Sequence, residues 1–258
     1  PADASTGSQL FWLFLAIVGA MLIAIIIGAI TGSIISHIGA HPILVTLGSM
    51  TIISGIGIYL TKGAALSGMP PVVRSIGSEV IMGIPVPMII FIVTTVALAL
   101  FLGKTRTGKT IYMCGSNINA TWFSGIRTDR VLIAIYAISS MLCVLAGLIM
   151  LARFNSARMG YGDSYLLLTV LAIVLGGTDP FGGAGKVSHV FCALLVLQVI
   201  ATGLSLLGLS LHFNLAVWGI TLIAALAFKF IKQKWQLQRD MNKSRKIFQQ
   251  QLITREGK

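Results

Sequence analysis

Long apolar runs constrain this chain more than any other feature. Seven stretches almost free of charge alternate with short polar connections: 10–35, 43–60, 86–102, 131–152, 165–175, 187–207 and 215–230. A helix needs about 20 apolar residues to cross the hydrocarbon core of a bilayer. With 56% hydrophobic and 10% charged residues, the chain also lacks the polar surface of a soluble globule. The sequence therefore predicts an all-α, polytopic transmembrane helical bundle with about seven membrane segments.

One short apolar run and one long connection affect how these segments are counted. The run 165–175 has only 11 residues before Gly176, so it is either a tilted helix extended by its neighbours or a broken helix buried in protein. The stretch 62–85 is punctuated by glycine and proline and is expected to be an irregular connection.

The segment 103–130 is the one long polar interruption between crossings. It carries five cationic residues and the single acid Asp129, and the cations are Lys104, Arg106, Lys109, Arg127 and Arg130. Basic loops stay cytoplasmic by the positive-inside rule. If the crossings alternate, 15 of the 19 Lys and Arg residues lie on that side. We expect a transmembrane domain over 1–231 with a cytoplasmic loop at 103–130, and a basic cytoplasmic tail at 232–258.

Several function classes find little support in the residues. The net charge is +12, but the basic residues lie in loops and the tail and form no stripe interleaved with aromatics, so no nucleic-acid partner is predicted. Three widely spaced cysteines form no zinc or disulfide pattern. His37 and His41 have no adjacent glutamate and are interpreted as interfacial rather than as metal ligands. We predict no catalytic residues, no metal site and no cofactor.

The sequence GKTRTGKT at 103–110 matches the expression for a phosphate-binding loop, GxxxxGK[ST]. Such a loop works between a strand and a helix of a soluble α/β domain. Here an apolar crossing precedes it, so the lysines are interpreted as anchors at the cytoplasmic surface. No acidic residue lies in the middle of a crossing, which predicts that any transport is driven by a separate subunit rather than by a coupled ion.

Four segments resemble a known family, the ribose-type permeases of bacterial ABC importers, which are relatives of the branched-chain amino acid permeases. TGKTIY, GSN, Ala120 and SGI within 107–126 resemble its TGR-x-IYAIGGN-x-x-AA-x-x-SGI signature. LGGT, GG and Gly185 within 175–185 resemble its LGGT-x-x-x-GG-x-G loop, GLSLLG at 203–208 its NGLNLLG segment, and PILVTLGSM at 42–50 its PFIATLGTM segment. The family's first helices and GGIDLSVG region have no counterpart, and the chain begins without Met, so we expect an N-terminally truncated chain.

The resemblance implies a permease subunit of the bacterial plasma (inner) membrane, with its C-terminus in the cytoplasm, that imports a simple sugar or sugar-like polyol and is not an enzyme. The implied partners are a cytoplasmic ABC ATPase, a periplasmic or lipid-anchored sugar-binding protein and a second permease subunit. It also implies a short coupling helix around 115–126 that docks on the ATPase. The residues implied for that coupling are Gly115, Asn117, Ala120, Phe123, Ser124, Gly125 and Ile126.

Two further sets of residues complete the expected sites. Gly176, Gly177, Gly182, Gly183 and Gly185 form the glycine loop of the resemblance. Polar residues in or beside the late crossings are candidates for the translocation pathway, namely Asn155, Tyr165, Thr169 and Gln198. Alternative functions are a permease for branched-chain amino acids or nucleosides and, from a different class, a membrane-embedded enzyme or a structural membrane subunit.

Overall fold

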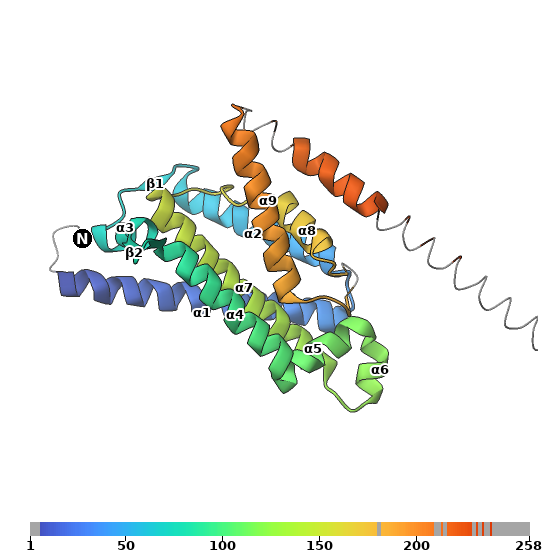
Figure 1. Ribbon diagram of the computed structural model, residues 1–258. Helices are drawn as coiled ribbons and strands as arrows, with labels where there is room; N and C mark the ends of the chain where they lie inside the picture. Colours follow the sequence, from blue (N-terminus) through green and yellow to red (C-terminus); the bar gives the residue numbers. More distant parts are fainter. Residues whose placement is uncertain are drawn as a thin grey trace, which may run out of the picture. The chain divides into compact units, whose positions relative to one another are not determined.

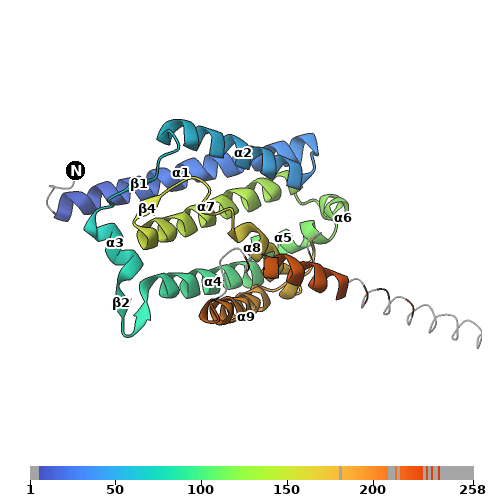
Figure 2. The same ribbon diagram turned by 90° about the horizontal axis from the view of Figure 1, so that it is seen from above.

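The computed structural model describes residues 6–179, 182–208, 213, 216–228, 231, 234 and 238. These residues form two compact units (Figures 1 and 2). The first unit contains residues up to Asp163 together with the loop 182–188, and the second contains 164–179 and the chain from His189 onward. The tail 232–258, predicted as a separate basic region, lies outside the described residues apart from 234 and 238.

The first unit is built from seven helices and two small antiparallel strand pairs. The helices are α1 (Thr6–Ile38), α2 (Pro42–Thr61), α3 (Pro71–Ser78), α4 (Val86–Lys104), α5 (Arg106–Ser116), α6 (Ile118–Phe123) and α7 (Thr128–Phe154). Strand β1 (Leu66–Ser67) pairs with β4 (Ser156–Ala157), and β2 (Val80–Ile81) pairs with β3 (Ile84–Pro85).

The main contact of the first unit is the seam between α1 and α7, which lie side by side in Figures 1 and 2. Glycine makes this close approach possible. A Cβ added at Gly28 would lie 2.5 Å from the Tyr136 carbonyl oxygen, and one added at Gly32 would lie 2.8 Å from the Ile133 Cα. Small residues allow such close backbone contact, which stabilises helix association in a membrane, where the hydrophobic effect does not drive helices together.

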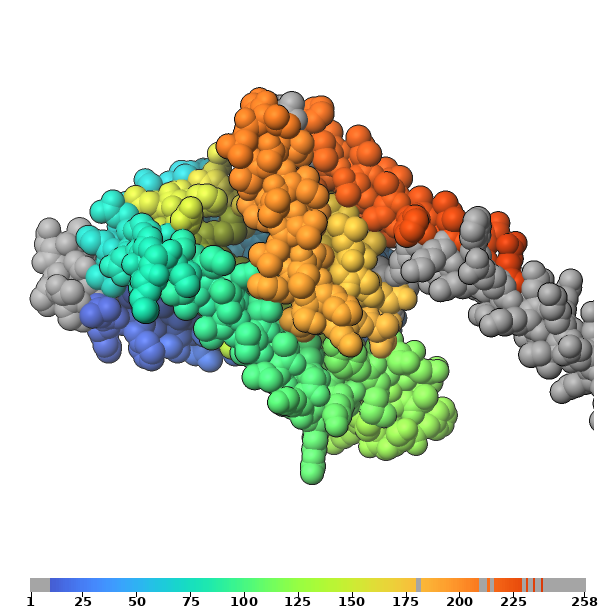
Figure 3. Space-filling model, in the orientation of Figure 1, coloured from blue at the N-terminus to red at the C-terminus, as the bar shows by residue number. Residues whose placement is uncertain are grey.

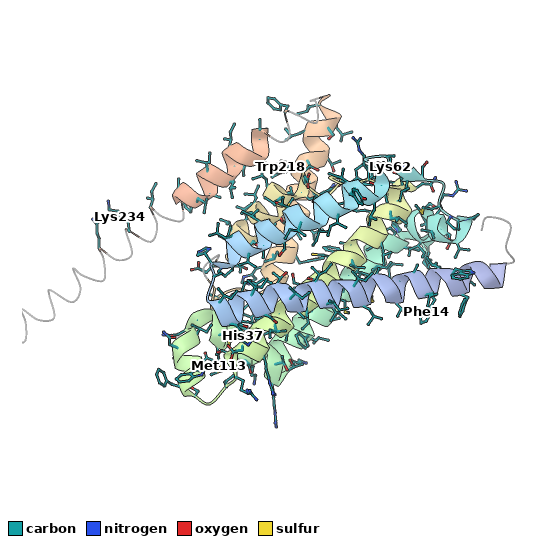
Figure 4. All side chains as sticks on the ribbon, turned by 180° about the vertical axis from the view of Figure 1, so that it is seen from behind. Phe14, His37, Lys62, Met113, Trp218 and Lys234 are labelled. Carbon is teal, nitrogen blue, oxygen red and sulfur yellow. The ribbon has the colours of Figure 1, made fainter. Side chains whose placement is uncertain are left out.

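The two ends of the first unit differ in structure. Helix α3 and the strand pairs lie at one end, and α5 and α6 lie at the other (Figure 1). In Figure 4, His37 and Met113 lie at the α5 end, and Phe14 and Lys62 lie at the opposite end. The stretch 62–85 is therefore not the irregular connection expected from its sequence. It contains α3, whose Gly77 packs against the backbone of Ala152 on α7.

The second unit has its own apolar core. It contains α8 (Tyr165–Leu175), most of α9 (Val187–Leu206) and a further helix, Ala216–Phe228. Leu171 and Ala172 of α8, Leu197 of α9 and Trp218 form a buried cluster. At the end of α8, a Cβ added at Gly176 would lie 2.8 Å from the Val190 Cα, so this glycine lets α8 and α9 meet closely.

Five helices among the described residues are long and apolar enough to cross a membrane: Leu10–Ile38, Pro42–Thr61, Val86–Lys104, Thr128–Phe154 and Val187–Leu206. Two shorter apolar helices, Tyr165–Leu175 and Ala216–Phe228, correspond to the other two predicted segments. The predicted helical membrane fold is confirmed, and the count of seven holds only approximately. At 1.5 Å per residue, the 11 residues of α8 span about 16 Å, roughly half of the hydrocarbon core.

Candidate functional site

Helix α6 is a short helix that presents two aromatic rings to solvent. Asn117 precedes it, and its side-chain oxygen accepts a hydrogen bond of 3.0 Å from the Ala120 amide, which caps the helix. Thr121 is buried and holds the inner face. On the outer face Trp122 is 60% exposed and Phe123 is 80% exposed, with ring centroids 5.0 Å apart in an edge-to-face arrangement. Figure 3 shows α5 and α6, in green, projecting from the lower end of the first unit.

The coupling helix predicted around 115–126 is shorter in the structure. Asn117 has an extended backbone, with φ −157° and ψ 106°, and this interrupts the helical path. Gly115 therefore belongs to α5, and only 118–123 form α6. Gly125, at φ 80°, closes the helix with its amide donating to the Trp122 carbonyl, and Ile126 follows half-buried.

Exposed cations lie on the elements before and after α6. Lys104 ends α4, Arg106 and Lys109 lie on the first turn of α5, and Arg127 and Arg130 lie at the start of α7. All five side chains are exposed. The aromatic pair is thus carried by a segment of strongly positive charge, with Asp129 as its one acid.

The structure brings part of the glycine loop against the end of α5. A Cβ added at Gly115 would lie 2.8 Å from the Gly183 amide nitrogen, and one added at Gly182 would lie 2.6 Å from the Gly115 carbonyl oxygen. The Tyr112 hydroxyl donates a hydrogen bond of 3.0 Å to the Gly185 carbonyl. Two regions that the sequence singled out separately are therefore one contact, and no sequence signal linked them. The remaining loop glycines, Gly176 and Gly177, belong to the second unit.

This contact fixes where the loop lies along the first unit. Strand β4 follows the far end of α7, whereas the loop 182–185 packs on α5 at the near end. The 27 residues of α7 separate these ends by about 40 Å. Strand β4 and the loop 182–185 therefore lie at opposite ends of the first unit.

The four candidate pathway residues are divided between the units. Asn155 ends α7 in the first unit with φ 51°, and its side-chain oxygen accepts a hydrogen bond of 3.1 Å from the Met69 amide. It thus ties together two connections at the α3 end. Tyr165, Thr169 and Gln198 lie in the second unit, and the Thr169 hydroxyl donates to the carbonyl of Leu166 within its own helix. Their role in a pathway stays a prediction.

The phosphate-loop expression at 103–110 folds as a helix–turn–helix. Helix α4 runs through Lys104, Thr105 accepts a hydrogen bond of 3.0 Å from the Gly108 amide, and α5 begins at Arg106. Gly108 is buried, and an added Cβ would meet the Leu102 backbone. This glycine thus serves the close turn between two helices. Nearby, burial raises the pKa of the Cys114 thiol above its ordinary value.

Comparison with known proteins gives the family. The sequence pattern of the family described as "Branched-chain amino acid transport system / permease component" matches residues 4–226. The chain is 36% identical over 186 residues to the ribose import permease protein of Bacillus subtilis (strain 168), covering 71% of this chain and 58% of the relative. It is 30% identical over 212 residues to the D-allose transport system permease protein of Escherichia coli (strain K12), covering 82% and 65%.

A third relative is the autoinducer 2 import system permease protein of Photorhabdus temperata, 28% identical over 210 residues, with 79% of this chain and 63% of the relative covered. The chain thus spans about three fifths of the length of these relatives. No solved structure matches it. The pattern match covers most of the chain and agrees with the apolar helices described above. The chain therefore belongs to the family of branched-chain amino acid transport system permease components.

Proposed function

We propose that this protein is the membrane-spanning permease subunit of an ATP-driven importer and that it has no enzymatic activity of its own. The observation that carries this proposal, beyond the family, is the exposed aromatic pair Trp122 and Phe123 on a short capped helix among exposed cations. Exposed aromatic residues on a rigid support are typical anchors of protein interfaces. A short helix at the cytoplasmic end of two membrane helices suits docking in a groove of an ATPase.

The energy for transport comes from that ATPase. The Asp, Lys and Arg residues of the spanning helices of the first unit lie at helix ends, as Lys104, Asp129 and Arg153 do, so these helices offer no carboxylate in mid-membrane to bind a driving ion. When the ATPase closes around ATP, it moves α6 together with the helices joined to α6. This movement opens the translocation pathway first to one side of the membrane and then to the other. A second permease subunit and a periplasmic or lipid-anchored binding protein complete the importer.

The proposed orientation places α5, α6 and the C-terminal tail in the cytoplasm of a bacterium. The five cations of the 103–130 loop support this by the positive-inside rule. The contact between Gly115 and Gly183 adds support because it places the glycine loop on the same side as α5.

The proposed substrate is a simple sugar or sugar-like polyol. The relatives named for ribose and D-allose support this class. Branched-chain amino acids are the second candidate because the family's description names them. Uptake of radiolabelled ribose, allose and leucine into cells that express the complete importer tests the choice. Saturable leucine uptake without sugar uptake would reverse it.

Co-purification with the ATPase tests the docking role. We expect the ATPase to co-elute with the wild type and to be lost from Phe123→Ala, because this change removes an exposed ring without disturbing a core. Tyr59→Ala is the matched control, since Tyr59 is an equally exposed aromatic residue, 84%, at the opposite end of the first unit. If the ATPase binds the Phe123→Ala and Tyr59→Ala variants equally well, α6 is not the docking element.

A further inference from the structure

The contact between α5 and the glycine loop is made almost entirely by backbone. Gly115 on one side meets Gly182 and Gly183 on the other, and each added Cβ would come within 3.0 Å of a backbone atom of the partner segment. A Cβ added at Gly183 would lie 2.8 Å from the Ser116 Cα. The hydrogen bond from the Tyr112 hydroxyl to the Gly185 carbonyl fixes the register of the contact.

The connectivity of the chain gives this contact a mechanical consequence. Residues 182–188 pack as part of the first unit, whereas the chain before and after them, from 164 and from His189, belongs to the second unit. Helix α9 begins at Val187, directly after the loop. The segment that carries the proposed docking helix is thus in contact with the chain that leads into the second unit.

We infer that the Gly115–Gly183 contact is the rigid link through which movement of the docking helix α6 reaches α9, with Gly115, Gly183 and Tyr112 as positioning residues. This inference rests on the proposed function. Helix α6 follows α5 after the single residue Asn117, so a push on α6 is transmitted to the end of α5. Backbone surfaces in contact have no side-chain rotamers to absorb a displacement, and packed interfaces resist continuous deformation. The link therefore moves as one body during transport.

Breaking the link separates ATP hydrolysis from transport. Gly115 is helical, so alanine suits its backbone, and the only penalty of Gly115→Ala is the Cβ placed against Gly183. Gly103→Ala is the matched control because Gly103 lies in the last turn of the neighbouring helix α4 and an added Cβ there would have nothing within 4 Å. With protein purified together with its ATPase and reconstituted with the binding protein, we expect Gly115→Ala to lower uptake about ten-fold while ATPase binding and hydrolysis persist. Gly103→Ala keeps wild-type uptake.

Removing the hydrogen bond that fixes the register gives a second test. Tyr112→Phe removes only the hydroxyl that donates to the Gly185 carbonyl at 3.0 Å and adds no atom to the contact. We expect Tyr112→Phe to lower uptake while ATPase binding and hydrolysis persist. Tyr59→Phe is the matched control, because Tyr59 is an exposed tyrosine at the opposite end of the first unit.

The outcomes separate this inference from the proposed function. Undiminished uptake by Gly115→Ala and Tyr112→Phe overturns the link. Loss of ATPase binding or hydrolysis in these variants overturns it too, because the contact then serves the fold or the docking rather than the transfer of movement. Failure of the wild type to bind the ATPase overturns the proposed function, and the inference that rests on it falls with it.

Discussion

The substitution Asn117→Ala tests whether the cap of α6 sets the stability of the docking helix. The Asn117 side chain accepts from the Ala120 amide at 3.0 Å, and alanine leaves that amide without its partner at the start of the helix. Other bonds to this residue use its backbone, as when the Thr121 hydroxyl donates to the Asn117 carbonyl, and they survive the change. The substitution therefore removes one defined hydrogen bond.

The expected magnitude follows from the length of α6. Replacing an N-cap asparagine with alanine costs about 1 kcal/mol, which lowers the ratio of folded to unfolded helix about five-fold. A helix of six residues has little else to hold it, because helices this short are marginal in water without tertiary contacts. Among its residues only Thr121 is buried, so the loss cannot be spread over a large packed face.

Hydrogen exchange at the end of the helix measures this effect without reference to transport. The Ser124 and Gly125 amides donate to carbonyls within α6, so their protection reports the folded helix. We expect protection to fall about five-fold in Asn117→Ala and to be restored in Asn117→Ser, whose hydroxyl also caps. Asn119→Ala removes the same side chain from an exposed position inside α6 and should not lower protection, because alanine is the better helix former there. Equal losses in Asn117→Ala and Asn119→Ala would refute the capping argument.

Three further results are expected. Gly28→Ala at the α1–α7 seam should cost about 1–3 kcal/mol of stability by overpacking, seen as a lower thermal midpoint, whereas Gly19→Ala, with open space around it, should not. Cys114 should be alkylated slowly at neutral pH and faster only in alkaline buffer, because its raised pKa keeps the thiol protonated; alkylation as fast as in denatured protein would contradict this. A fluorophore on Met82→Cys, at the uncharged hairpin tip four residues before the start of α4, should be quenched by brominated lipid, and one on Glu79→Cys should be quenched by aqueous iodide. The reverse pattern would place the tip in water.

Hydropathy along the chain predicted the apolar core of the membrane helices but not all of their ends. The expected run 165–175 coincides with α8, because the polar residues before it and the glycines after it end both the apolar run and the helix. The expected run 131–152 is shorter than α7, Thr128–Phe154. Hydropathy marks the part that suits hydrocarbon, whereas the helix continues through charged residues such as Asp129 and Arg153 into the interface. Helix ends depend on caps and turns rather than on polarity.

Helix α3 shows what a sequence pattern alone could not provide. Its eight residues include one arginine and one glycine, and only Val73 and Gly77 are buried, four residues apart. Two turns give too short a period for a reliable hydrophobic pattern. Helix α3 is stabilised by α7, which is distant in the sequence. The backbone of Gly77 packs against the backbone of Ala152 and Arg153, and the Arg153 guanidinium donates a hydrogen bond of 3.5 Å to the Gly77 carbonyl.

The same limit applies to the candidate site. The family resemblance identified the segment of α6 and the glycine loop as two motifs, but it did not predict that the loop packs against α5, directly before α6. The contact between α5 and the glycine loop depends on which glycines lie against the backbone of another segment. The sequence does not distinguish those glycines from glycines that only end a helix. Gly115, Gly182 and Gly183 have no room for a Cβ, whereas Gly125 and Gly177, in the same motifs, have open space and are fixed by positive φ instead.

The sequence GKTRTGKT at 103–110 contains one glycine of each kind. Its two glycines, Gly103 and Gly108, are equivalent in a pattern for phosphate binding, where both free the backbone around the anion. In the structure they are not equivalent. Gly103 lies in the last turn of α4, where an added Cβ would have nothing within 4 Å, whereas Gly108 is buried against the backbone of Leu102. A loop built around phosphate would need both glycines, whereas a tight turn from α4 into α5 needs only the second. The contacts of the two glycines therefore explain the match by helix packing, without a nucleotide.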